Sequence, residues 1–146
     1  MIVNNIAIGS DHAGFELKEF LKDYLLNKNI NIKDFGPDSD ARADYADYAH
    51  PVANCVENNT DYLGILICGS GNGINMTANK HQAIRSALCW NAEIAELARL
   101  HNNANILVLP ARFITKEEAI KCVDIFFNTL FEGGRHTDRV KKIACK

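Results

Sequence analysis

The segment Cys68-Gly69-Ser70-Gly71-Asn72-Gly73 joins a thiol to three glycines in five positions. Glycines let backbone amides converge on an anion, and a helix that begins in this loop adds the positive end of its dipole. The same positive end lowers the pKa of a nearby thiol from about 8.5, so Cys68 is a candidate base. The alternative is a small buried residue that ends a strand before a tight turn, and the loop alone leaves both interpretations open.

Two further segments offer carboxylate, imidazole and amide groups: GSDHAG, with Asp11 and His12, and LHNNAN, with His101 and Asn102. His101 is a candidate proton donor near neutral pH. Each pair also has a structural alternative. Asp11 could serve as a helix N-cap and His12 as a surface residue, while histidine and asparagine are both favoured at a helix C-terminus.

Three arginines complete the candidate set. Arg112 follows an expected strand and would place a cation at that edge of the sheet. Arg135 and Arg139 are four positions apart, so on a helix they share one face, and two guanidinium groups on one face suit a phosphate dianion. The alternative is a solvated charged helix in which Asp138 pairs with a neighbouring base.

Other familiar sites do not fit the spacing. The glycine loop lacks the GxGxxG pattern and follows the third expected strand, so it does not predict a dinucleotide site. There is no GxxxxGK[ST] phosphate loop and no GxSxG elbow. No cluster of histidine, aspartate and glutamate shows metal-ligand spacing, so we expect neither a metal nor an organic cofactor.

Composition limits the kinds of partner. The chain has 146 residues and a net charge of −2, which gives no reason to expect nucleic acid or an anionic membrane. No apolar run approaches the roughly 20 residues of a membrane span, and the N-terminus does not resemble a signal peptide. The five cysteines form no CxxC pair. This pattern favours a reducing, cytoplasmic setting.

Hydrophobic periodicity predicts strands that alternate with helices throughout one domain, residues 1–146. Strands are expected over residues 2–9, 30–35, 62–68, 83–88 and 105–109. Helices are expected over residues 15–26, 45–59, 71–80, 91–100 and 115–130, followed by a helical arm over 135–144. This order predicts an α/β fold: a Rossmann-like three-layer α/β/α domain with a five-stranded parallel sheet and a C-terminal helical arm. Ligands of such sheets bind beyond the carboxyl ends of the strands, which here are followed by the candidate loops.

Seven segments in order give the chain a resemblance that covers essentially its whole length. They are GSDHAG, DY at 44–45, ILICGSGNGINMTANK, IRSALC, LHNNAN, VLPAR and EGGRHTDRV. At these residues the sequence resembles type B ribose-5-phosphate isomerase, in the family that also holds galactose-6-phosphate isomerase subunits. The resemblance implies an enzyme of the pentose phosphate pathway that interconverts ribose 5-phosphate and ribulose 5-phosphate. It also implies a homodimer, sometimes a tetramer, whose active sites are shared between two subunits.

The family pattern assigns roles to matching positions. It makes Cys68 the base that removes the proton and His101 the acid that opens the sugar ring, with His12 and His136 as rivals for that second role. The resemblance implies that Gly69 to Gly73 hold the enediolate oxygen. Further substrate and phosphate contacts are implied for Asp11, His12, Asn102, Arg112, Arg135 and Arg139. Some relatives use a glutamate just after the loop, where this chain has Ile74, so the cysteine version applies. Ala46 stands where many relatives have proline.

Two other functions stay open at this point. One is an isomerase of a six-carbon substrate such as allose 6-phosphate or galactose 6-phosphate, which would use the same residues. The other is a non-catalytic module that binds a phosphosugar or a nucleotide. A substrate panel separates the first from a five-carbon isomerase, and exchange of the substrate C2 proton with solvent separates catalysis from binding.

Overall fold

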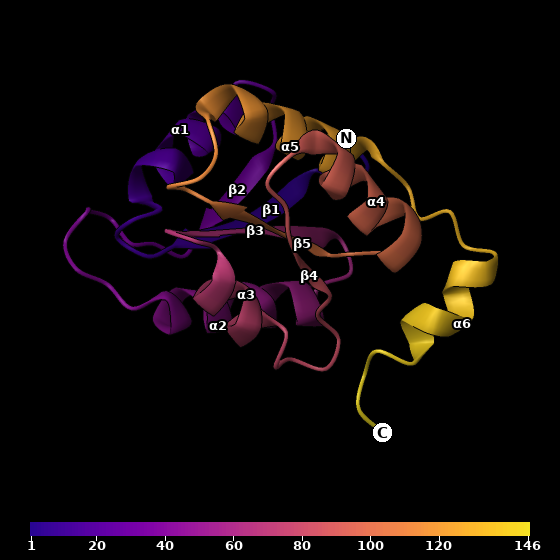
Figure 1. Ribbon diagram of the computed structural model, residues 1–146. Coiled ribbons are helices and arrows are strands. Elements are labelled where there is room, and N and C mark those ends of the chain that lie inside the picture. The colour runs from indigo at the N-terminus through magenta and orange to yellow at the C-terminus, as the bar shows by residue number, and fades with distance from the viewer.

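The computed structural model describes residues 1–146, and its centre is a five-stranded parallel sheet (Figure 1). The strands lie in the order β2-β1-β3-β5-β4, so β3 occupies the middle. Their bounds are β1 (Asn5–Ser10), β2 (Asn31–Asp34), β3 (Tyr62–Cys68), β4 (Ser86–Leu88) and β5 (Ile106–Pro110). Because β3 pairs with β1 on one side and β5 on the other, the loops after these three strands meet at one edge of the sheet.

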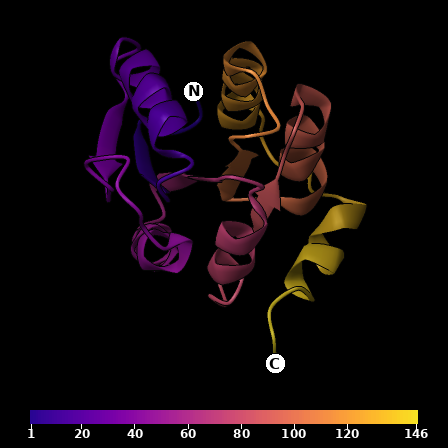
Figure 2. The same ribbon diagram turned by 60° about the vertical axis from the view of Figure 1, so that its left-hand side comes forward.

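Helices cover both faces of the sheet, which confirms the predicted three-layer fold. Their bounds are α1 (Phe15–Leu26), α2 (Tyr45–Asn58), α3 (Asn72–Ala78), α4 (Ala92–Asn102), α5 (Lys116–Asn128) and α6 (Arg135–Lys141). One core packs α1, α4 and α5 against the sheet, and a second packs α2 and α3 against the other face (Figures 1 and 2). β3 is buried along almost its whole length, as its unbroken apolar run predicts.

Two strands begin later than the periodicity predicts, because other groups take their backbone hydrogen bonds. The amide of Ile2 donates to the carbonyl of Phe127 at the end of α5, and β1 starts only at Asn5. Before β4, the amide of Arg85 donates to the Asn105 side chain, which also donates to the carbonyl of Ala83. The Asn105 side chain therefore takes the Ala83 carbonyl and the Arg85 amide. Only the carbonyl of Arg85 accepts from the neighbouring backbone, from the amides of Asn105 and Ile106.

The turn between β1 and α1 is fixed against the central strand. The amide of Asp11 donates to the carbonyl of Ile67 over 3.1 Å, and Gly14 follows directly above the same carbonyl. A Cβ added at Gly14 would lie 2.5 Å from the Ile67 oxygen, so only glycine allows α1 to start this close to β3. This close packing of the β1–α1 turn against β3 holds Asp11 and His12 next to the end of the strand that carries Cys68.

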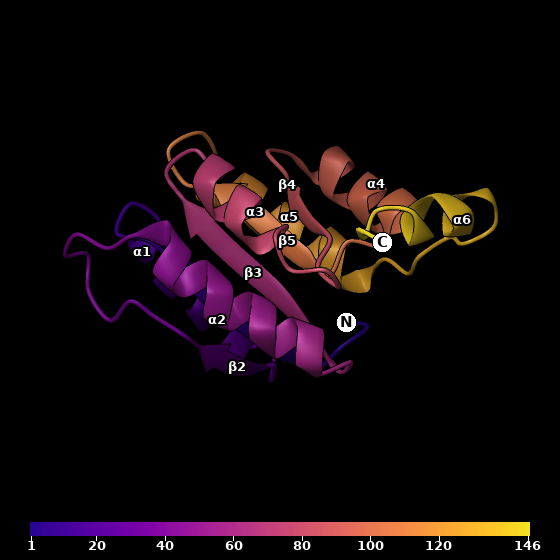
Figure 3. The ribbon, with the colours of Figure 1, turned by 90° about the horizontal axis from the view of Figure 1, so that it is seen from below.

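α6 is an arm that lies beyond the opposite end of the sheet (Figures 1 and 3). The amide of Glu132 donates to the carbonyl of Leu100, which attaches the start of the arm to the end of α4. Gly133 and Gly134 both have positive φ angles, of 72° and 56°, and turn the chain into α6. None of the helices has the length and apolar character that crossing a membrane requires.

Candidate active site

A cavity of about 310 Å³ opens at the carboxyl ends of β1, β3 and β5. Its lining gathers the loops after all three strands, as the sequence predicts. The lining residues are Asp11, His12, Ala13, Tyr45, Cys68, Gly69, Ser70, Gly73, Arg112 and Phe113. A larger cavity, of about 590 Å³, lies against the C-terminal tail, but Asn102 is the only predicted site residue that lines it. The smaller cavity is therefore the better candidate for the chemistry.

Cys68 is the last residue of β3 and is only 4% exposed. Burial raises the pKa of the Cys68 thiol above its ordinary value, and the negative charge of Asp11 adds to the rise. The amides of Ile74, Gly71 and Ser70 act in the opposite direction without outweighing burial. The prediction of a lowered pKa is therefore wrong for the free protein, although the predicted amides do surround the sulfur.

The raised pKa can be tested by alkylation of the free protein. We expect the rate at which iodoacetamide modifies Cys68 to rise about tenfold per pH unit from pH 6 to about pH 8.5, because the thiolate fraction grows by that factor below the pKa. Mass spectrometry of the Cys68 peptide measures the rate, and the exposed Cys145 serves as a control for the reagent. A rate that levels off above about pH 7 would contradict the account.

The glycine loop is held in shape by its neighbours. Gly71 has a φ of +79°, and a Cβ there would lie 2.3 Å from a methyl group of Leu88, so both backbone conformation and space require glycine. A Cβ at Gly73 would lie 2.4 Å from the ring of Tyr45. The Ser70 hydroxyl accepts a hydrogen bond from the amide of Asn72 over 3.2 Å. The loop backbone is thus fixed before any ligand binds.

Arg112 places a cation beside this loop. Its amide donates to the carbonyl of Gly69 over 3.0 Å, and the amide of Ala111 donates to the carbonyl of Cys68 over 2.9 Å. A Cβ built on Gly69 would lie 3.1 Å from Nη1 of Arg112, so the guanidinium group lies over the loop. This position suits a group that binds an anionic substrate next to the thiol.

Asp11 and His12 form the wall opposite Arg112. Oδ1 of the buried Asp11 accepts a hydrogen bond from the amide of Gly14 over 3.0 Å, which fixes the turn before α1. The N-cap of α1 is Gly14 itself and not Asp11. His12 is exposed, and its Nδ1 lies 3.1 Å from the carbonyl oxygen and 3.2 Å from the amide nitrogen of Ala43. The loop before α2 thereby orients the imidazole at the rim of the cavity.

The other predicted residues lie at the far end of the sheet. α4 connects β4 to the parallel strand β5, so it runs back against the strands and ends at their amino-terminal edge. His101 and Asn102, at the end of α4, are thus separated from Cys68 by at least the length of β5, about 16 Å for five residues. Arg135 and Arg139 lie on α6 near the same end, both exposed. One chain therefore holds two incomplete groups of candidate residues.

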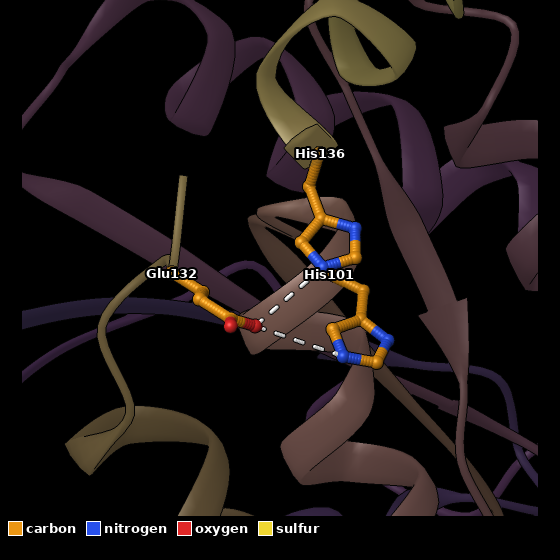
Figure 4. Close-up of side chains that lie close together, drawn as sticks. All are labelled: His101, Glu132 and His136. Carbon is orange, nitrogen blue, oxygen red and sulfur yellow. Dashed lines mark ion pairs between the residues drawn. The ribbon is translucent and has the colours of Figure 1, made fainter. Parts of the chain in front are cut away.

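A cluster of His101, Glu132 and His136 lies at that far end (Figure 4). The two imidazole rings stack with centroids 4.3 Å apart, and Nε2 of His101 and of His136 lie 3.8 Å and 3.5 Å from Oε2 of Glu132. The fold thus brings together three potential metal ligands that spacing along the sequence does not reveal. Glu132 and His136 are four positions apart in the sequence, a signal that could have been read, but His101 joins them only through the fold.

The sequence interpretation also missed two aromatic residues of the cavity. Tyr45, 43% exposed, packs its ring on Gly73, and Phe113 follows Arg112 at the rim. Tyr45 belongs to the DY pair that supports the resemblance, but the pair alone implies no role in the site. No sequence signal shows that the loop over residues 37–44 brings this ring to the glycines.

Comparison with known proteins finds relatives along nearly the whole chain. The model of the ribose/galactose isomerase family matches residues 6–143. Ribose-5-phosphate isomerase B of Escherichia coli is 40% identical over 142 residues, covering 97% of this chain and 95% of the relative. A crystal structure of a ribose 5-phosphate isomerase from Thermotoga maritima has a TM-score of 0.94 and 51% identity, covering 96% of this chain and 97% of that one. A Mycoplasma genitalium ribose-5-phosphate isomerase B, solved with bound ribulose-5-phosphate, has a TM-score of 0.91 and 49% identity, covering 95% and 93%.

Proposed function

The chain belongs to the ribose/galactose isomerase family, and from this premise we propose that it interconverts ribose 5-phosphate and ribulose 5-phosphate at the cavity around Cys68. The observation that carries the proposal is the buried thiol at the end of β3, next to a preformed ring of backbone amides. The bound ribulose-5-phosphate of a relative that is 49% identical supports the five-carbon substrate.

The residues of the cavity account for a proton transfer. The Cys68 thiolate takes the proton from C2 of the open-chain aldose, and the electrons of that bond form the enediolate. The amides of the glycine loop stabilise the oxygen on which negative charge develops. The hydroxyl proton of O2 is transferred to O1, and return of the abstracted proton to C1 yields the ketose. Burial disfavours the thiolate in the free protein, and the amides around the sulfur offset this effect only in part.

We further propose that the site is completed by a second copy of the chain. His101 and the arginines of α6 lie too far from Cys68 to reach the same substrate within one chain, as the direction of α4 requires. Large apolar side chains are exposed at Met76, Trp90 and Phe113, by 64%, 53% and 74%, and Phe113 lines the cavity. Exposed apolar groups of this size favour a protein interface. A homodimer would bring the partner's His101 to the ring oxygen and the partner's arginines to the phosphate.

We also propose that residues 1–146 act as one isomerase domain in a reducing, cytoplasmic setting. All candidate residues surround a single sheet, which supports one functional unit. Four of the five cysteines are buried and none forms a disulfide, as expected where thiols stay reduced.

A substrate panel tests the five-carbon assignment. We expect kcat/KM on ribose 5-phosphate to exceed that on allose 6-phosphate and galactose 6-phosphate by at least about tenfold, because one additional hydroxymethylene group must be accommodated between the thiol and the phosphate site. Coupled assays of ketose formation measure all three substrates at the same enzyme concentration. A higher kcat/KM on either six-carbon substrate would assign the site to that sugar.

A further inference from the structure

The His101, Glu132 and His136 side chains converge from two separate segments of the chain. Figure 4 shows both imidazoles directing a ring nitrogen toward the Glu132 carboxylate. One potential ligand atom from each residue lies within 4.8 Å of the other two. The backbone holds the two segments together. The Glu132 amide donates a hydrogen bond to the carbonyl of Leu100 near the end of α4, and two glycines with positive φ follow Glu132.

His136 is the residue of this cluster that most needs a partner. It is 5% exposed, and its Nε2 atom is buried without a hydrogen bond. The Glu132 carboxylate lies 3.5 Å away, which is too long for an effective hydrogen bond. A buried polar atom that is left unpaired lowers the stability of the fold. A metal ion that binds the lone pair of the neutral imidazole nitrogen would remove this cost.

The three ligand types and their spacing fit a transition-metal ion. Two imidazoles and one carboxylate form a common zinc ligand set, with a fourth position left open. Tetrahedral zinc with bonds of about 2.0–2.1 Å holds neighbouring ligand atoms about 3.3 Å apart. The Nε2-to-Oε2 distances of 3.5 Å and 3.8 Å lie within a few tenths of an ångström of this spacing. The two stacked imidazoles must also turn toward the ion, because a ring nitrogen binds metal in the plane of its ring.

We propose that His101, Glu132 and His136 bind a divalent transition-metal ion such as Zn²⁺, and that the bound ion inhibits the enzyme by occupying His101. The inhibitory part rests on the proposed function, in which the imidazole of His101 opens the sugar ring. Arg135 and Arg139 oppose a cation, so the binding energy must come from the three ligand bonds.

A second histidine pair provides a matched control. Nδ1 of His50 lies 2.8 Å from Nε2 of His81, whose Nδ1 lies 3.2 Å from Glu57. Both ring nitrogens of His81 are therefore already paired, and this cluster has no buried unpaired nitrogen. The variant His50→Gln changes the number of histidines without touching the proposed site.

Binding is measured on the full chain after metal is removed with a chelator. Competition between the protein and a chromophoric chelator for Zn²⁺ should show one ion per chain. The affinity should fall at least about tenfold in Glu132→Gln and His136→Gln and stay unchanged in His50→Gln. Co²⁺ absorption should show nitrogen and oxygen ligands without the charge-transfer band of a thiolate. Wild-type affinity in Glu132→Gln, which alters an exposed side chain, or a thiolate band, would overturn the site.

Inhibition is measured separately, as turnover of ribose 5-phosphate over a Zn²⁺ titration. Wild-type protein should lose activity as the site fills and regain it when chelator is added. Glu132→Gln should need at least about tenfold more Zn²⁺ to lose half of its own metal-free activity. Activity that persists at saturating Zn²⁺ would overturn the inhibitory role. Metal-free protein without isomerase activity would instead refute the proposed function, whereas the binding titration decides the site independently.

Discussion

Replacing Cys68 with alanine is expected to lower kcat on ribose 5-phosphate by about 10²–10⁴-fold or more, the range typical for loss of a general acid or base. The variant should stay folded, because it removes one sulfur from a strand end and leaves the apolar run of β3 unchanged. It should also still bind a sugar phosphate, since the loop amides and Arg112 are retained. Steady-state kinetics, circular dichroism and calorimetric titration measure the three properties.

The control for this prediction is Cys145→Ala. Cys145 is exposed and lies in the C-terminal tail, away from the cavity at the end of β3. We expect this variant to keep wild-type kcat and KM. Near-normal turnover in Cys68→Ala would remove Cys68 as the base, and loss of folding in Cys68→Ala would show a structural role for the sulfur.

Mixing two inactive variants, Cys68→Ala and Arg139→Ala, is expected to restore activity. If each site takes its thiol from one subunit and its α6 arginines from the other, half of the dimers in an equal mixture are mixed and one site in each is intact. About a quarter of all sites should then be of wild-type composition. The measurement is turnover after co-refolding or co-expression, with mixed dimers quantified by two different affinity tags.

A matched mixture separates this result from a general effect of mixing. Cys68 and Asp11 line the same cavity of the same chain, so a mixture of Cys68→Ala with Asp11→Ala places one substitution in every site of a mixed dimer. We expect no recovery there. Mixed Cys68→Ala and Arg139→Ala dimers without activity would show that the site lies within one chain.

The sequence predicts most of what the sheet alone determines. The apolar run of β3 identifies the central strand, and the glycines after it identify the cavity, because both signals are local. The predicted strand starts at Ile2 and Ala83 are wrong. The amide of Ile2 binds a backbone carbonyl at the end of α5, and the carbonyl of Ala83 binds the side chain of Asn105. Local periodicity carries no information about such long-range competition.

The site was predicted as a set of residues but not as an arrangement. The direction of Cys68's pKa shift was wrong because burial depends on the packed fold, whereas the neighbouring amides can be read from the loop. The position of His101 at the opposite end of the sheet follows from the topology of α4, which the sequence interpretation predicted without drawing that consequence. Tyr45 reaches the cavity, and Glu132 reaches His101, through loops whose course no local sequence pattern determines.

Exchange of the C2 proton tests the central claim most directly. Ribose 5-phosphate is incubated with the protein in deuterated water, and NMR follows the C2 proton signal of the sugar. The account predicts that wild-type protein removes this signal as ribulose 5-phosphate forms, and that Cys68→Ala leaves it as stable as in buffer alone. A C2 proton that persists while the wild-type protein binds the sugar, or that Cys68→Ala exchanges at the wild-type rate, would contradict it.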